Sequence, residues 1–191
     1  MIAITEHDDS PPAPGNLELL QRFLNLHGHD PSGRRTDPPL EAIRGFLVER
    51  GLLDPEQRFT AANRETSLGL QRALRDLIAT NEGGRPSPND AALLDRLGVE
   101  AGLHPHFHAG RRPTLEPREC GARAAFGTIV AIAFLASFDG TFEHLKLCAA
   151  SDCRAVFYDR SKNHSARWCS MDVCGNRAKV RAWRERQKAG T

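Results

Sequence analysis

The sequence lacks the short motifs that mark the common enzyme classes. Its 191 residues contain no glycine-rich phosphate loop, no nucleophile elbow and no carboxylate pair tied to a base by a motif. We therefore expect that the chain is not an enzyme. It also lacks internal repeats, and the only biased segment is the proline-containing start, residues 1–15, which we interpret as a flexible leader.

A secretory signal is absent as well, because residues 1–15 carry neither a cationic segment nor an apolar stretch. We expect a cytoplasmic protein, in which thiols stay reduced. One long apolar run, residues 121–138, is at the lower limit for a transmembrane helix and contains Arg123. We interpret it as a buried core helix and expect no membrane association.

The net charge is only +2, but the charged residues are unevenly distributed along the chain. From Cys148 to Thr191 there are ten Lys/Arg and four Asp/Glu, whereas the remainder has sixteen Lys/Arg and twenty Asp/Glu. This asymmetry indicates a mildly acidic body with a basic C-terminal part that would seek a polyanion such as nucleic acid.

Apolar residues at helical spacing predict a mainly helical first part. Asn16 and Asp37 are placed to cap the first two helices, and Gly51 to end the second in a left-handed conformation. The expected helices begin at Asn16, begin after Asp37, run from about Ala61 to Thr80, pass through Leu93, Leu94 and Leu97, and cover residues 119–137.

Residues 103–116 differ in character, because His104, His106 and His108 alternate with Pro105 and Phe107. We expect a small hairpin closed by residues 114–115, with Phe107 turned inward and the histidines on a solvated edge strand. The alternative, a second metal site formed by the three histidines, stays open at this point.

Four cysteines, Cys148, Cys153, Cys169 and Cys174, fall as C-x4-C, fifteen residues, then C-x4-C. Two short loops that each present two thiolates suit a closed tetrahedral site, so we expect one structural Zn²⁺ per chain. Two disulfides, an iron–sulfur cluster, another thiophilic metal, or His144 in place of Cys148 are the alternatives. The fifth cysteine, Cys120, is expected to be an ordinary buried thiol.

Two β-prone patches, Val156-Phe157-Tyr158 and Arg167-Trp168, lie between the cysteine pairs and predict a hairpin over the metal. Ser170 is placed to cap a helix that carries Cys174 in its first turns, where the helix dipole favours a thiolate. This order of elements is treble-clef-like.

Behind Cys174 a basic, proline-free stretch predicts a helix on which Arg177, Arg181, Arg184 and Lys188 form one cationic stripe. We expect Val173, Val180 and Trp183 to dock this helix on the hairpin. Arg177 could instead donate a hydrogen bond to the Cys174 thiolate. The candidate nucleic-acid contacts are Asn176, Arg177, Lys179, Arg181, Arg184 and Lys188.

The stretch Trp168 to Arg181, with Cys174-Gly175-Asn176-Arg177 at its centre, resembles the CGNR zinc finger, a bacterial family named for those four residues. More loosely, Phe23-Leu24-Asn25 and Phe46-Leu47 resemble the start of the ABATE domain, which often precedes this finger; Phe46 stands where tryptophan is expected. The resemblance implies a zinc-binding, DNA-binding, stress-induced transcription regulator.

The expected fold is therefore α+β. A mainly α-helical, ABATE-like domain with a small β-hairpin, residues 16–143, would precede a treble-clef-like zinc finger with a basic C-terminal helix, residues 144–191. The leading function is a DNA-binding transcription regulator whose body senses a small-molecule effector or forms a homodimer. The alternative is a zinc-stabilised protein-interaction module, and RNA also stays open as a partner, with Trp168 or Tyr158 stacking on bases.

Overall fold

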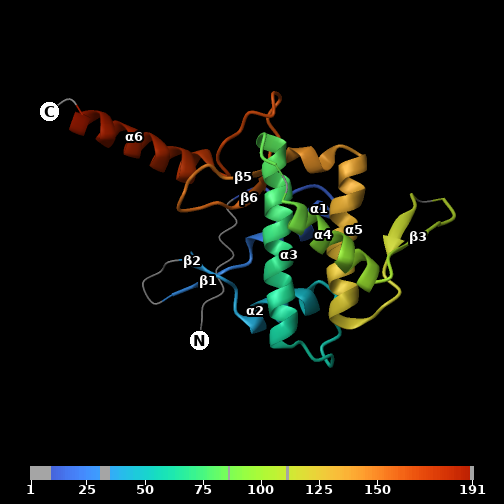
Figure 1. Ribbon diagram of the computed structural model, residues 1–191. Helices are drawn as coiled ribbons and strands as arrows, with labels where there is room; N and C mark the ends of the chain where they lie inside the picture. The colour runs from blue at the N-terminus through green and yellow to red at the C-terminus, as the bar shows by residue number, and fades with distance from the viewer. Residues whose placement is uncertain (1–9, 31–34, 86, 111, 190–191) are drawn as a thin grey trace.

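The computed structural model describes residues 10–30, 35–85, 87–110 and 112–189. A helical body, residues 16–143, leads into a small cysteine-rich unit, residues 144–189, which we call the finger; the last helix projects from the finger away from the body (Figure 1). The helices are α1 (Leu17–Asn25), α2 (Leu40–Glu49), α3 (Ala61–Ala79), α4 (Pro88–Glu100), α5 (Gly121–Phe138) and α6 (Asn176–Ala189), with short helical turns at Thr80–Glu82, Thr141–His144 and Met171–Gly175. The strands are β1 (Gly28–His29), β2 (Arg35–Thr36), β3 (His104–His106), β4 (Thr114–Glu116), β5 (Leu145–Leu147) and β6 (Val156–Tyr158).

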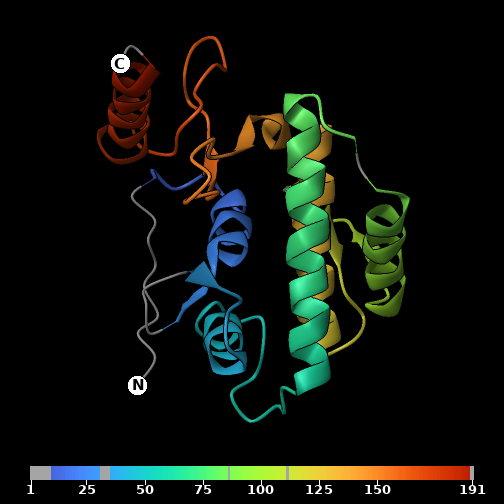
Figure 2. The same ribbon diagram turned by 60° about the vertical axis from the view of Figure 1, so that its left-hand side comes forward.

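Five helices build the body where their apolar spacing predicts them. Helix α3 lies at the centre, with α5 behind it, α4 on one side, and α1 and α2 on the other (Figure 2). Helix α5 is long and apolar enough to cross a membrane by length and composition alone. Its contacts with α1, α3 and α4 bury Ala125 and Ile129 completely, whereas Phe134 and Phe138 near its end are 50% and 77% exposed. The expectation of a buried core helix therefore holds for one face of α5 only.

The helix ends follow the expectation in part. Gly51 has φ of +68°, the left-handed conformation expected after α2. Asn16 precedes α1 but its side chain makes no capping hydrogen bond. Asp37 does not cap α2, because Pro39 occupies the N-cap position with an extended backbone and the helix begins only at Leu40.

We expected residues 1–15 to form a flexible leader. Residues 1–9 lie outside the described residues. The following residues, 10–13, are held against α1. Gln21 on α1 is fully buried; its side-chain oxygen accepts a hydrogen bond from the Ala13 amide at 2.6 Å, and its nitrogen donates to Ser10 Oγ at 2.9 Å. Since a buried amide must be hydrogen-bonded, Gln21 fixes residues 10–13, and the leader is not flexible there.

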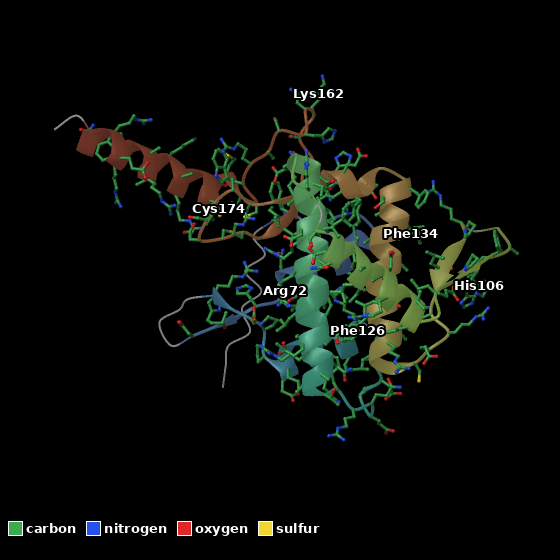
Figure 3. All side chains as sticks on the ribbon, in the orientation of Figure 1. Arg72, His106, Phe126, Phe134, Lys162 and Cys174 are labelled. Carbon is green, nitrogen blue, oxygen red and sulfur yellow. The ribbon has the colours of Figure 1, made fainter. Side chains whose placement is uncertain are left out.

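The small hairpin of the body is confirmed: β3 and β4 pair antiparallel, with His106 opposite Thr114. Phe107 is not turned inward but is 77% exposed, because the strand ends at His106 and Phe107 belongs to the turn. His106 lies on this hairpin at the edge of the body (Figure 3). His106 and His108 stack at 4.4 Å between ring centroids, and both reach Glu116. Within the described ranges, no metal-ligand cluster other than the four cysteines is present, so a second metal site gains no support.

Body and finger meet at the antiparallel pair β5–β6. Leu145, Leu147 and Val156 belong to the core of the body, whereas Phe157 packs against Cys148 and Cys174 in the finger. Side chains along a strand alternate between two faces, so one strand pair serves both cores. The Asn25 amide at the end of α1 binds the backbone of β6, accepting from Val156 N and donating to Val156 O, each at 2.8 Å. The expected packing of finger on body is therefore present.

Gly127 on α5 tests the packing of the body. A Cβ at this position would lie 2.3 Å from the Ala101 Cβ, so we expect Gly127→Ala to lower the free energy of unfolding by about 1–3 kcal/mol through overpacking. Urea unfolding measures the change. Gly45 on α2 is the matched control, because a Cβ there meets nothing within 4 Å and Gly45→Ala should stabilise by about 0.5–1 kcal/mol. Equal effects of the two substitutions would contradict the described contact of α4 with α5.

Candidate metal centre

The sulfurs of the four cysteines of the finger come together from different segments of the chain. Cys148 follows β5 directly, and Cys153 and Cys169 lie in loops. Cys174 lies in the helical turn before α6 (Figure 3). Their Sγ atoms all lie within 4.8 Å of one another. Cys148 and Cys174 are buried and the other two are half-buried, so the cluster is largely closed to solvent.

The sulfur spacing fits a tetrahedral ion. Four sulfurs at about 2.3 Å from a central zinc stand about 3.8 Å apart. The Sγ atoms of Cys153 and Cys169 are 3.7 Å apart, and those of Cys169 and Cys174 are 3.6 Å apart. A disulfide would need about 2.05 Å, and all five cysteines of the chain are free thiols. The four residues can therefore hold one Zn²⁺, and four protein ligands leave no open position for catalysis.

The crowding of the four thiols shifts their pKa values in a way that also favours a cation at the centre. The hydrogen bond from Cys169 lowers the pKa of Cys153 to about 5, whereas its interaction with Cys153 raises the pKa of Cys169 far above the usual range. Burial raises the pKa of Cys174, opposed by a hydrogen bond from Arg177. Crowded thiols thus cannot all ionise by themselves, and a divalent cation removes that obstacle by binding the thiolates.

The first turn of the last helix is built as expected. Ser170 Oγ accepts from the Val173 amide at 3.3 Å, which caps the turn carrying Cys174. The Arg177 guanidinium donates to Cys174 Sγ at 3.1 Å and pairs with Asp152 at 3.1 Å. Arg177 is therefore a hydrogen-bond donor to a metal ligand, which is one of the two roles considered for it from the sequence.

The expected hairpin over the metal has the wrong partner. Val156–Tyr158 pairs with Leu145–Leu147, not with Arg167-Trp168. Residue 167 contributes one backbone bond, from the Ala149 amide to its carbonyl at 2.8 Å. The reason is burial, since Leu145 and Leu147 can cover the body core while Arg167 is exposed. The treble-clef description stays a prediction.

The prediction that Val173, Val180 and Trp183 dock α6 on the hairpin is also wrong. Trp183 is 56% exposed, Val180 48% and Val173 41%, so these residues do not hold the helix on the finger. The face of α6 that points toward the finger instead carries Arg177, Arg181 and two alanines. This face and residues 149–152 together line a cavity of about 170 Å³. Arg181 reaches Asp152 at 3.7 Å and Ser151 Oγ at 3.3 Å. The contacts of the helix with the finger are therefore those of Arg177 and Arg181 with Asp152, Ser151 and the Cys174 sulfur.

Two further residues depart from the sequence interpretation. Cys120 is exposed at the N-cap of α5 and is not a buried thiol, because the helix begins only at Gly121. His144 does not replace Cys148 in the sulfur cluster; its ring stacks on Tyr158 at 5.2 Å and contacts His164 at 4.2 Å between centroids.

The candidate nucleic-acid residues divide into two groups. Arg177 and Arg181 are engaged with the finger, and the Asn176 side chain donates to Asp172 O at 3.2 Å. Lys179 and Arg184 are exposed on α6, whereas Lys188 lies in α6 with a side chain outside the described part. The stripe is therefore not one uniform surface.

A buried ion pair was missed by the sequence interpretation. Lys146 Nζ lies 2.9 Å from Asp159 Oδ2, and the Asp159 carboxylate also accepts from the amides of Ser161 and Ala166. Burial alone would raise the pKa of Asp159, but the hydrogen bonds of Ser161 and Lys146 outweigh it and hold the pKa below the usual range. The only available signal was the charged Lys146 between Leu145 and Leu147 on a strand.

Comparison with known protein families identifies the same segment. The family model described as the CGNR zinc finger matches residues 144–187, which are the β5–β6 pair, the four cysteines and most of α6. The body is not part of this match. No curated protein matches the chain. The family match and the sulfur geometry together support the binding of one Zn²⁺ by the four cysteines.

Removal of one ligand tests the metal centre. We expect Cys174→Ser to weaken zinc binding by more than about tenfold, because even loss of a residue hydrogen-bonded to a ligand costs 10- to 100-fold. Metal content per chain and competition with a chromogenic chelator measure this. Cys120→Ser is the control, since Cys120 is exposed and outside the cluster. A zinc affinity that is the same in both variants would rule out the four-cysteine site.

The buried ion pair predicts a second effect on the finger. Asp159→Asn should lower the free energy of unfolding of the zinc-bound protein by about 3–5 kcal/mol, because it leaves the Lys146 charge buried without its partner. Combining it with Lys146→Met should recover part of the loss in a double-mutant cycle. Glu100→Gln, in an exposed pair with Arg96, is the control and should change stability by less than about 1 kcal/mol. Additive effects of the two finger substitutions would contradict the pair.

Proposed function

We propose that this chain is a zinc-containing transcription regulator in which the finger presents α6 to DNA. The observation that carries the proposal is a cationic helix anchored next to the metal centre and projecting from the body (Figure 1). Its 14 residues include six Lys/Arg and one Glu. A helix of this length spans about 21 Å along its axis, and its diameter of about 10–12 Å fits a major groove about 12 Å wide.

The contacts that hold α6 on the finger indicate which of its residues are left to touch DNA. Arg177 and Arg181 pair with Asp152 and hold the helix, so their main effect is positional. The exposed cations of α6 that make no contact with the finger in the described part of the chain are Lys179, Arg184 and Arg186. We infer that these three track phosphates, with Asn176 and Lys188 as further candidates, and that zinc acts by fixing the direction of the helix.

The body would supply regulation or assembly. Its resemblance to the ABATE domain supports a role in a stress-induced regulator, with ligand sensing or homodimerisation as the task of the helices. Because β5–β6 packs in the body core and carries Cys148 at its end, a change in the body can reach the finger through this strand pair.

A salt series with a fluorescent duplex DNA tests the proposal. The zinc-bound protein should bind with an affinity that falls steeply with salt, and Lys179→Ala/Arg184→Ala/Arg186→Ala should reduce the slope of log K against log[salt] by about two to three. The matched control is Arg96→Ala/Arg123→Ala, which removes exposed cations from α4 and α5. Unchanged binding by the α6 variant, or no binding by the parent protein, would remove the DNA assignment.

A second candidate function has its own observation. Val180 and Trp183 are 48% and 56% exposed on the same helix, an arrangement that also suits a protein partner taking an amphipathic helix into an apolar groove. The same DNA titration separates the two functions. Trp183→Ser should leave the salt slope unchanged if the helix binds phosphates, because serine removes apolar surface but no charge. A protein-interaction module would show no salt-dependent DNA binding at all.

A further inference from the structure

A second cationic site lies where body and finger meet, apart from the outer face of α6. A cavity of about 630 Å³ is lined by α1, β2, α3 and the finger loop 151–154. Four arginines line it: Arg35 on β2, Arg72 and Arg75 on α3, and Arg154 on the finger loop. Figure 3 shows Arg72 on the side of α3 that faces β1 and β2.

Arg35 and Arg75 join the two parts of the molecule through backbone oxygens. Arg35 donates to Cys153 O at 2.7 Å and to Asn25 O at 3.5 Å. Arg75 donates to Leu24 O at 2.8 Å and to Arg154 O. Each guanidinium has five N–H groups, so in each case three remain that no described residue accepts.

The positive charge of the cavity is not balanced by its own carboxylates. Two carboxylates line the cavity beside the four arginines: Asp37, and Asp152, which already pairs with Arg177 and Arg181. Among the described residues, no ion pair involves Arg35, Arg72, Arg75 or Arg154. Burial, with the nearby charges of Arg35 and Arg154, lowers the pKa of Arg75 to about 10. Like charges held together in a partly buried space favour a bound counter-anion.

The negative charge of the sulfur cluster acts on Arg35 and Arg75 through Cys153, but neither of these guanidinium groups donates to a sulfur in the described part of the chain. Arg177 is the guanidinium that donates to a ligand sulfur, at 3.1 Å from Cys174 Sγ. The bonds of Arg35 and Arg75 end instead on carbonyl oxygens of the loop, and Arg72 and Arg154 face the cavity. Their charges are therefore directed to the space between body and finger.

We propose that this cavity binds a small, doubly charged oxyanion, a phosphate monoester or a dicarboxylate, held by Arg35, Arg72, Arg75 and Arg154. Guanidinium groups bind both kinds of oxygen in a bidentate manner. The cavity is larger than an inorganic anion needs, and Leu24, Leu26 and Leu68 line it, so the ligand carries an uncharged part beside its anionic group.

Such a ligand would bridge the two parts of the chain. Arg72 and Arg75 belong to the body and Arg154 to the finger, so the anion would replace their mutual repulsion by attraction and tighten the contact of α3 with the loop that carries Cys153. This inference does not depend on DNA binding by α6. It supplies a chemical class for an effector whether the partner of the finger is nucleic acid or protein.

Calorimetric titration of the zinc-bound full chain with inorganic phosphate and with succinate, at constant ionic strength, tests the proposal. At least one of the two should bind saturably, and acetate should bind at least about tenfold more weakly because it carries one charge. Arg72→Ala should weaken binding by about three- to tenfold. Arg96→Ala, an exposed arginine of α4, is the matched control and should bind like the parent protein.

Arg75→Gln should weaken binding by more than about tenfold, but it also removes bonds between body and finger. Arg72 is exposed and makes no hydrogen bond in the described part of the chain, so Arg72→Ala decides the result if Arg75→Gln misfolds. Failure of both anions to bind, or equal binding by Arg72→Ala and Arg96→Ala, would overturn the proposal. Arg72→Ala lowering duplex affinity in a protein that binds neither anion would also overturn it and assign the arginines to nucleic acid.

Discussion

The structure depends on one strand pair that belongs to two cores. On β5–β6 the leucines and Val156 face the helices of the body, whereas Lys146 and Phe157 face the finger. The first metal ligand, Cys148, follows the last residue of β5 without an intervening loop. The metal centre is consequently not tethered to the body by a linker but begins inside its core, and the two hydrogen bonds of Asn25 to Val156 attach β6 to α1.

Charge around the sulfur cluster decides how the last helix points. Four thiolates on one Zn²⁺ leave two net negative charges, and Arg177 lies against one of them while sharing Asp152 with Arg181. These contacts turn the first part of the cationic stripe toward the finger and leave Val180 and Trp183 in solvent. The surface that α6 offers to a partner is thus mixed, with exposed cations beside an apolar patch, and the metal centre controls it through the arginines.

The contact between body and finger has two kinds of interaction with different consequences. The side chains of the strand pair that face the body are apolar and closely packed in its core, so this contact is rigid. The cavity beside it is lined by both arginines and leucines, and guanidinium bonds to carbonyl oxygens connect the body and the finger there. A rigid joint next to an adjustable one is a suitable arrangement for transmitting ligand binding from α3 to the loop that carries Cys153.

Local patterns in the sequence determined the helices of the body, the small histidine hairpin, the Ser170 cap and the grouping of the four cysteines, because spacing and capping act over a few residues. The tertiary structure alone decided the partner of β6, the outward turn of Trp183, the exposure of Cys120 and the meeting of Arg35 with Arg75. The sequence pattern within a segment shows that one face of that segment must be buried, or that one of its charges needs a partner. Which distant segment meets that need depends on the competition among all faces and charges of the folded chain.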